Sequence, residues 1–276
     1  MAAGIDRNSI TDAVIASFAG AGDARTREVM AALVRHLHDF AREVDLRPEE
    51  WRAAVAFLTD AARITDEARN EFVLASDVLG FTSLTDLLRS APGATPRSVL
   101  GPFHAEGAPE RAPGAVLAPG RAGQRVRVHG RVLDVAGSPV PGAVIDFWQA
   151  DAEGRYWQQD PTQTPEDFRF RMRAGEDGAY AFETVRPAPY TVPYDGPVGR
   201  LLRALGRHAW RPAHFHFRVE APGFAPLTTE VFPEDDPYLA QDAVFGVREA
   251  LVARLEPVAG TPALELAFDF RLARAE

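Results

Sequence analysis

The first part of the chain has apolar residues three or four positions apart, which is the spacing of one face of an α-helix. Between positions 25 and 44 this stripe consists of Val29, Leu33, Leu37, Phe40 and Val44. A second helix is expected to start near Pro48, with acids in its first turn and a stripe that continues through Trp51, Val55 and Leu58. A third is expected from Asp66 towards Val78, and a short fourth after Thr82. The pattern predicts a helical N-terminal domain over residues 1–90.

The pattern changes after Ser90, where proline and glycine interrupt any helix. We interpret residues 91–123 as a linker that carries one apolar run at 99–103. Short apolar or alternating segments then follow between turns, at 126–132, 143–148, 168–172, 179–182, 214–219, 227–232 and 263–272. Helical character returns only between Pro237 and Leu255. The chain is therefore predicted to be an α+β protein, in which the helical domain precedes an antiparallel β-sandwich over residues 124–276.

The composition is that of an ordinary globular protein and excludes several classes of function. With 276 residues, 46% of them hydrophobic, the chain can bury a substantial core. Its net charge of −9 argues against general binding of nucleic acid or of an anionic membrane. Because there is no cysteine, any metal must be held by His, Tyr, Asp or Glu. No apolar run is long enough to span a bilayer and no secretion signal is visible, so we expect a cytoplasmic protein.

Two histidines, His214 and His216, stand at alternate positions on an expected strand, close to Arg211. Side chains two apart on a strand share one face, so both imidazoles are able to bind one metal ion. The pair alone does not fix the metal, since copper, zinc, manganese and iron all accept two imidazoles. Either histidine is also compatible with a core or surface position in which backbone hydrogen bonds satisfy the ring.

Two tyrosines upstream, Tyr156 and Tyr190, make a metal site more specific. A free phenol has a pKa of roughly 10, so only a strongly acidic metal ion makes tyrosinate a ligand near neutral pH. Phenolate oxygens combined with imidazole nitrogens therefore favour ferric iron. Tyrosines that follow turns also serve as anchoring aromatics, and Tyr180 and Tyr238 fit that role. Spacing alone leaves both roles open for Tyr156 and Tyr190.

Together with the segments around them, these residues resemble the intradiol ring-cleaving dioxygenases, and most closely the branch that acts on hydroxyquinol. The resemblance covers nearly the whole chain, at positions 34–40, 76–80, 100–104, 132–134, 149–151, 195–199, 206–208, 211–216 and 242–247. It implies one Fe(III) ion whose protein ligands are Tyr156, Tyr190, His214 and His216. It also implies that Tyr190 is released when substrate binds and takes up a substrate proton, and that the nearby Tyr194 is not a ligand.

The reaction implied by the resemblance is cleavage of the hydroxyquinol (1,2,4-trihydroxybenzene) ring between its adjacent hydroxylated carbons. Both atoms of O2 enter the product, which is 3-hydroxy-cis,cis-muconate or maleylacetate. Catechol or a chlorocatechol is the alternative substrate. Carried over by position, the substrate-binding residues are Leu74, Asp77, Val99, Leu100, Gly101, Pro102, Phe103, Val192, Pro193, Arg211 and Val244. Packing in the core is the alternative role of the apolar residues in this set.

Three polar residues carry particular expectations within this resemblance. Asp77 at the pocket edge is expected to hydrogen-bond the third hydroxyl of hydroxyquinol, which catechol lacks. Arg211 is expected to be catalytic by stabilising developing negative charge, with a surface ion pair as its alternative role. Glu230 is a departure, because the family usually has Gln or His in this strand. We do not expect Glu230 to be a ligand, since a fifth protein group would leave too little room for a bidentate substrate.

A function of another class is suggested by residues 128–134 and 177–182, which also resemble transthyretin-like β-sandwich modules that bind without catalysing. That resemblance ends before His214 and gives no reason for Tyr190 or Arg211. The dioxygenase resemblance further implies a homodimer joined through the N-terminal helices, because a small helical unit has an apolar face to hide. It also implies phospholipid held at that interface.

Overall fold

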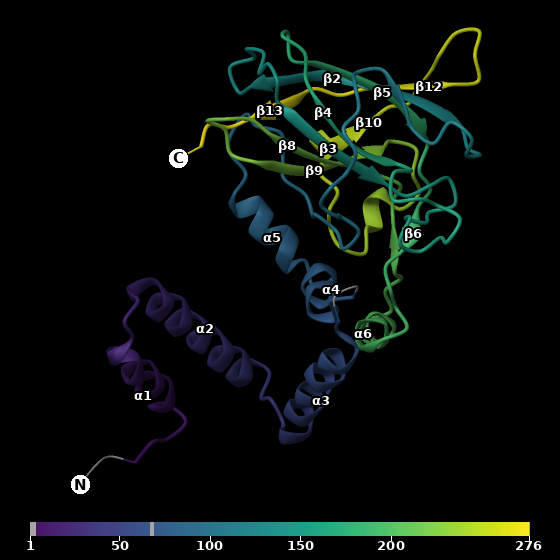
Figure 1. Cartoon of the computed structure of the whole chain (residues 1–276). Coiled ribbons are helices and arrows are strands. Elements are labelled where there is room, and N and C mark those ends of the chain that lie inside the picture. The colour runs from purple at the N-terminus through teal and green to yellow at the C-terminus, as the bar shows by residue number, and fades with distance from the viewer. Residues whose placement is uncertain (1–3, 67–68, 276) are drawn as a thin grey trace. The chain divides into compact units, whose positions relative to one another are not determined.

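The computed structural model describes residues 4–66 and 69–275. The chain divides into two compact units, Met1–Asp60 and Ala61–Glu276, and each is described by itself. Figure 1 shows the helical start of the chain in purple and blue, and the strands in teal, green and yellow. The expected order of a helical region followed by a sandwich of sheets is therefore confirmed.

The first unit contains three helices and a 3-10 turn. Its elements are α1 (Ile10–Ala16), the 3-10 turn η1 (Ser17–Gly20), α2 (Ala24–Glu43) and the larger part of α3 (Pro48–Ile64). The side chain of Asp23 accepts the N–H groups of Arg25 and Thr26 and so caps the start of α2. Both α2 and α3 match the predicted helices, whereas α1 was not predicted. Their apolar stripes remain exposed, at Val29, Leu33, Leu37, Phe40, Trp51, Val55 and Leu58.

The second unit begins with the end of α3 and two short helices, α4 (Glu71–Val78) and α5 (Phe81–Leu88). Asn70 caps α4 by accepting the N–H groups of Phe72 and Val73, and residues 67–68 of the predicted third helix lie outside the described residues. Gly80 makes the left-handed turn between α4 and α5, with φ of 72°.

A sixth helix, α6 (Pro197–Ala204), was not predicted and packs against α4. The fully buried carboxylate of Glu71 accepts the N–H of Val198 in the first turn of α6, at 2.9 Å. A carboxylate at a helix N-terminus satisfies unpaired N–H groups and is favoured by the helix dipole. This contact fixes the start of α4, and hence the helix that carries Leu74 and Asp77, to the first turn of α6.

The sandwich consists of two main sheets. The first sheet contains β1 (Ala115–Val116), β5 (Ala179–Val185), β2 (Arg125–Asp134), β12 (Leu264–Ala267), β11 (Glu256–Pro257) and β13 (Phe270–Leu272). The second contains β10 (Val252–Ala253), β9 (Leu227–Pro233), β8 (Phe215–Glu220), β3 (Val144–Gln149) and β4 (Arg169–Arg173). Between them lies a core rich in phenylalanine, including Phe147, Phe170, Phe182, Phe217 and Phe270. A separate pair is formed by β6 (Tyr190–Thr191) and β7 (Trp210–Arg211).

The prediction of purely antiparallel sheets is wrong in detail. The strands β12 and β13 run parallel to β2, and two short edge strands are parallel to β5 and β9. Parallel neighbours arise because long connections return the chain to the sheet from the same end. The predicted closing strand is also split, with Phe268 and Asp269 standing between β12 and β13.

The helix expected between Pro237 and Leu255 is absent from this segment. Only two 3-10 turns form, η2 (Leu239–Gln241) and η3 (Glu249–Leu251). The reason lies at Asp242, whose carboxylate accepts the N–H groups of Val244 and Gly246. An aspartate that bonds nearby backbone in this way offers the chain an alternative to the helix. None of the helices in residues 4–66 and 69–275 combines the length and apolar character needed to cross a membrane.

Candidate metal centre and substrate pocket

The two histidines and two tyrosines of the predicted metal site converge from three parts of the sandwich. His216 lies in β8 and His214 directly precedes it, while Tyr156 follows β3 and Tyr190 begins β6. The Nε2 atoms of His214 and His216 are 3.0 Å apart, and the Tyr156 hydroxyl is 3.4 Å from Nε2 of His214. The rings of Tyr190 and His214 have centroids 5.5 Å apart. All four side chains are buried.

The histidines are in the form that binds metals. Burial lowers the pKa of His214 and lowers that of His216 further, and Arg211 acts in the same direction on both, so both rings are neutral. Nδ1 of His214 lies 2.7 Å from the carbonyl oxygen of Pro212, which accepts a hydrogen bond from Nδ1–H, so that the proton stays on Nδ1 and Nε2 keeps its lone pair. That lone pair faces His216 Nε2, and a cation between the two nitrogens is a natural partner for both.

Two aromatic rings hold the metal-site residues in place. Phe103 stacks on Tyr156 with centroids 4.2 Å apart, and Trp148 stacks on His216 with centroids 4.7 Å apart and planes only 8° apart. Gly101 passes close to the same histidine: a Cβ at this position would lie 3.3 Å from the His216 ring, and φ is 71°. Only glycine adopts this conformation without strain. The backbone at Gly101 therefore packs closely against the imidazole of His216, and a larger residue at this position would be strained.

The tyrosines are compatible with a strongly acidic metal ion. Burial raises the pKa of Tyr156 well above the usual value for a phenol, and the neighbouring Tyr190 raises it further. Burial also raises the pKa of Tyr190, although Arg211 opposes the rise. Both phenols are therefore neutral until a cation replaces their protons. Two phenolates and two neutral imidazoles suit a trivalent ion, because they offset most of its charge in a dry pocket.

Arg211 lies beside the histidines at the centre of a buried ionic network. Its Nη1 and Nη2 atoms donate to the two oxygens of Glu230 at 2.7 and 3.1 Å. Nε and Nη2 donate to the two oxygens of Asp242 at 3.0 and 3.2 Å. Ser98 donates to Glu230 at 2.6 Å. Five N–H bonds are available on a guanidinium. One of them, on Nη1, is left over and lies on the side facing Nε2 of His214, 3.4 Å away.

Glu230 is the residue in which the sequence departs from the family pattern. Its carboxylate, His214 and His216 form a cluster whose ligand atoms lie within 4.8 Å of one another, which is the geometry of a metal site. Both carboxylate oxygens, however, are already bonded to Arg211, and one also accepts from Ser98. Bidentate pairing with arginine satisfies a buried carboxylate well. Glu230 therefore serves as the counter-ion of Arg211.

A cavity of about 360 Å³ opens beside these residues. It is lined by Leu74, Asp77, Val99, Gly101, Pro102, Phe103, Tyr190, Val192, Pro193, Arg211 and Val244, all of which were candidate site residues. Leu100 is not among them, because its side chain is exposed while that of the preceding Val99 is buried. The lining also includes Arg69, Asn70, Val73 and Gln159, which were not predicted. The proximity of Gln159 to Tyr156 in the chain was the one available signal for that residue.

Asp77 is the acid in the wall of this cavity. Its side chain is buried, and its Oδ1 atom has no hydrogen-bond partner among the described residues. Burial raises the pKa of Asp77, with Thr82 and Arg211 acting in the opposite direction. A buried carboxyl oxygen without a partner is costly to the fold, and a ligand with a matching hydroxyl would remove that cost.

Comparisons with known proteins cover nearly the whole chain. Residues 99–274 match the family model described as dioxygenase, and residues 23–95 match the model described as the catechol dioxygenase N terminus. The chain is 48% identical to a 6-chlorohydroxyquinol 1,2-dioxygenase from Cupriavidus pinatubonensis, over 97% of each protein. It is 46% identical to a hydroxyquinol 1,2-dioxygenase from a Rhizobium species, over 90% of this chain and 85% of the relative.

A solved structure extends the similarity to the fold. The crystal structure of a hydroxyquinol 1,2-dioxygenase from Pseudomonas putida DLL-E4 matches with a TM-score of 0.90 and 41% identity, covering 98% of this chain and 99% of the other. These matches include the segment from His214 to Glu230, which the transthyretin-like resemblance leaves unexplained. They confirm the prediction of an enzyme over that of a binding module. With its helical N terminus, its sandwich and its paired histidines and tyrosines, the chain belongs to the intradiol ring-cleavage dioxygenases.

Proposed function

We propose that the protein is an Fe(III) enzyme that cleaves hydroxyquinol between its adjacent hydroxylated carbons, using O2 and giving 3-hydroxy-cis,cis-muconate or maleylacetate. The observation that carries this proposal is the unpartnered carboxyl oxygen of Asp77 in the wall of a cavity that also contains Tyr190 and Arg211. The similarity to a 6-chlorohydroxyquinol 1,2-dioxygenase and to a hydroxyquinol 1,2-dioxygenase supports it. Catechol or a chlorocatechol is the alternative substrate, and the name of the N-terminal family model favours that class.

The iron would be held by Tyr156, Tyr190, His214 and His216. When bound, ferric iron draws electron density from a catecholate, so that O2 adds to the aromatic ring. Two of these ligands, Tyr156 and His216, would be held in place by packing, whereas Tyr190 would be able to leave the metal. Phe103 and Trp148 stack on Tyr156 and His216, so these two ligands are held by packing. Tyr190 faces the cavity, and burial raises its pKa. Once released, its phenolate therefore takes up a substrate proton readily.

Arg211 would act through its remaining N–H. Its other donors are bonded to Glu230 and Asp242, which fix the guanidinium in one orientation. The remaining N–H, on Nη1, points to Nε2 of His214 at 3.4 Å, and Arg211 itself lines the cavity. A preoriented donor at this point stabilises negative charge that develops on a reacting oxygen, without reorganising during the reaction. Because Glu230 and Asp242 offset its positive charge, Arg211 would act mainly by holding one N–H donor in a fixed orientation and less by its net charge.

Asp77 would select the substrate. The third hydroxyl of hydroxyquinol supplies the partner that Asp77 Oδ1 lacks within the protein. Catechol carries no hydroxyl at that position and would leave the buried oxygen unpaired. Enzymes that bind a substrate hydroxyl in this way discriminate strongly against analogues without it.

The proposal is tested by measuring oxygen uptake of purified protein after loading with ferric iron. We expect one O2 to be consumed per hydroxyquinol, with catechol processed more slowly, and a red to burgundy colour from tyrosinate-to-iron charge transfer. Protein that binds zinc in preference to iron and stays colourless would contradict the iron site. Faster turnover of catechol or of a chlorocatechol would instead favour the alternative substrate class.

We also propose that a second copy of the chain covers the apolar stripes of α2 and α3, giving a homodimer with phospholipid held at the interface. Leu33, Leu37 and Phe40 on α2, and Trp51 on α3, are exposed in the single chain. Contiguous apolar surfaces of this kind mark interaction sites. A self-complementary interface needs such a surface on each copy, which identical chains supply.

Light scattering tests this assembly with one substitution. The mass of the wild-type protein in solution should be twice that of the chain, and Leu37→Glu should shift the protein towards the monomer because it places a charge in the centre of the stripe. Arg25→Glu, at an exposed position on the same helix, is the matched control and should leave the mass unchanged. A wild-type protein that remains monomeric at high concentration would contradict the dimer.

A further inference from the structure

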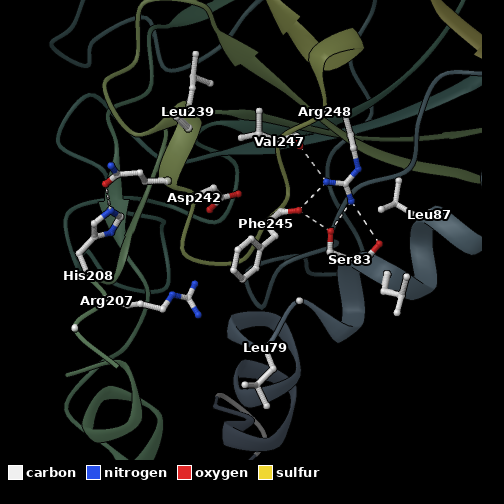
Figure 2. Close-up of a pocket in the computed structure, with 15 residues that line it drawn as sticks. Leu79, Ser83, Leu87, Arg207, His208, Leu239, Asp242, Phe245, Val247 and Arg248 are labelled. Carbon is white, nitrogen blue, oxygen red and sulfur yellow. Dashed lines mark hydrogen bonds between the residues drawn. The ribbon is translucent and has the colours of Figure 1, made fainter. Parts of the chain in front are cut away.

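Three of the segments that carry the sequence resemblance meet close to the substrate cavity. They are residues 76–80 at the end of α4, residues 206–208 after α6, and residues 242–247 in the loop where no helix forms. A second cavity, of about 680 Å³, lies among them, and Figure 2 shows Arg207, Phe245, Leu79 and Asp242 at its walls. Two of these segments, 76–80 and 242–247, also contribute Asp77 and Val244 to the walls of the substrate pocket.

Arg207 joins those two walls. Its Nη1 donates to the carbonyl oxygen of Val78, and its Nη2 donates to that of Ala243 at 2.8 Å. Val78 directly follows Asp77 in α4, and Ala243 directly precedes Val244 in the loop. Both Asp77 and Val244 line the substrate cavity. One guanidinium thus holds the peptide groups beside two pocket residues that come from distant parts of the sequence.

The loop is held from the same side by a second set of contacts. Ser83 in α5 donates to the carbonyl oxygen of Phe245, and Arg248 donates to the carbonyls of Phe245 and Val247, as the dashed lines in Figure 2 show. Phe245 has φ of 56°, which a residue other than glycine adopts only when its surroundings impose it. Its ring centroid lies 4.7 Å from the guanidinium carbon of Arg207. The contacts from Ser83 and Arg248 therefore hold the loop in the conformation that places Val244 in the lining of the substrate pocket.

We propose that Arg207 is a positioning residue that sets the separation between Asp77 and Val244, and thereby the preference of the enzyme for a trihydroxylated ring. The proposal rests on the proposed function, in which Asp77 binds the third hydroxyl. A hydrogen bond depends steeply on distance and angle, so a small movement of α4 weakens the contact to that hydroxyl. Catechol has no group in contact with Asp77 and is less sensitive to the same movement. Two N–H groups of Arg207 are engaged with backbone carbonyls, which gives this side chain a structural role between α4 and the loop.

The test compares kcat/KM for hydroxyquinol and for catechol in the iron-loaded wild type, Arg207→Ala and Arg207→Lys. We expect the ratio of hydroxyquinol to catechol to fall by about tenfold in Arg207→Ala, mainly through KM for hydroxyquinol, because one hydrogen bond to a buried charged group is weakened. Lysine reaches one carbonyl at a time, so the ratio in Arg207→Lys should be intermediate. Arg254→Ala, at an exposed surface ion pair, is the matched control and should keep the wild-type ratio. If Arg207→Ala does not fold, Arg207→Lys carries the comparison.

A double-mutant cycle separates positioning from general damage. In an Asp77→Ala background, which removes the acceptor, Arg207→Ala should change the ratio by no more than about twofold, since coupled residues act through one contact. An equal loss for both substrates, or the same fall in the ratio with and without Asp77, would overturn the role of Arg207 and leave the proposed function intact. A wild-type enzyme that does not process hydroxyquinol would overturn the proposed function itself, and this inference with it.

Discussion

Replacing Tyr190 with phenylalanine should lower kcat for hydroxyquinol roughly a hundredfold to ten-thousandfold, which is the range for loss of a positioned proton acceptor. The ring would still fill its place beside Tyr156 and His214, where the present centroid distances are both 5.5 Å. Only the hydroxyl is lost, so the fold should be preserved. The iron-loaded variant should also absorb differently in the visible range, because one of two tyrosinate ligands is missing. Stopped-flow turnover and absorption spectra measure both effects.

Tyr194→Phe is the matched control for this experiment. Tyr194 lies four residues further along the chain and its side chain is half exposed, outside the lining of the substrate cavity. Its loss should leave both the spectrum and kcat close to those of the wild type. If Tyr190→Phe kept the wild-type spectrum and rate while Tyr194→Phe lost them, the assignment of the labile ligand would be wrong.

Arg211→Met should destabilise the fold by about 3–5 kcal/mol, which is the cost of removing one partner from a buried ionic network. Methionine fills much of the space but leaves Glu230 and Asp242 without their cation, and neither carboxylate is exposed to water. Activity should fall as well, because the donor facing His214 is removed. Urea unfolding of the metal-free protein measures the stability change without interference from iron binding.

Two further variants show whether the stability loss comes from the unpaired charges. Adding Glu230→Gln to Arg211→Met removes one buried charge and should recover part of the lost free energy of unfolding. Arg211→Lys keeps the positive charge but cannot bond both carboxylates in the bidentate manner, so it should be intermediate. A double variant that is no more stable than Arg211→Met alone would show that lost packing, and not charge, causes the effect.

The stability that Arg211 provides should depend on pH, because it acts on the ionised carboxylate of Glu230. Burial acts to raise the pKa of Glu230, but Arg211, His214 and Ser98 outweigh it and hold that pKa below its ordinary value. A carboxylate of this kind stabilises the fold above its ordinary pKa, and the contribution is lost as pH falls through the lowered value. Without Arg211 the pKa of Glu230 should rise, so protonation relieves the buried charge. The stability difference between wild type and Arg211→Met should therefore shrink on going from neutral to acidic pH.

The secondary structure could be predicted where one periodicity dominates a segment. The stripes of α2 and α3 and the alternation in β2 are examples, because each element carries its apolar side chains on one face. The helices α1 and α6 and the loop at 242–247 were not predicted. Their structures depend on contacts with distant residues, such as Glu71 at the start of α6 and Arg207 at Ala243. Periodicity within a segment carries no information about such partners.

The candidate site could be predicted only in part for a similar reason. His214 and His216 share a strand face, so their pairing follows from sequence spacing alone. Tyr156 and Tyr190 required the resemblance, because nothing local distinguishes them from anchoring aromatics. The pairing of Glu230 and Asp242 with Arg211 could not be foreseen from either source, since these residues lie on three separate segments that meet only in the folded sandwich. Leu100 was assigned by position, and the direction of its side chain required coordinates.

The strand β2 lies between β5 on one side and the late strands β12 and β13 on the other. On the ribosome, the edge of β2 that pairs with β12 and β13 therefore stays unpaired until the sequence between β2 and these strands has been synthesised. Phe270 and Leu272, which are fully buried in the core, lie in β13 and are translated after the other strands of the described residues. A stalled or shortened nascent chain that lacks β12 and β13 would therefore expose the phenylalanine-rich core to chaperones.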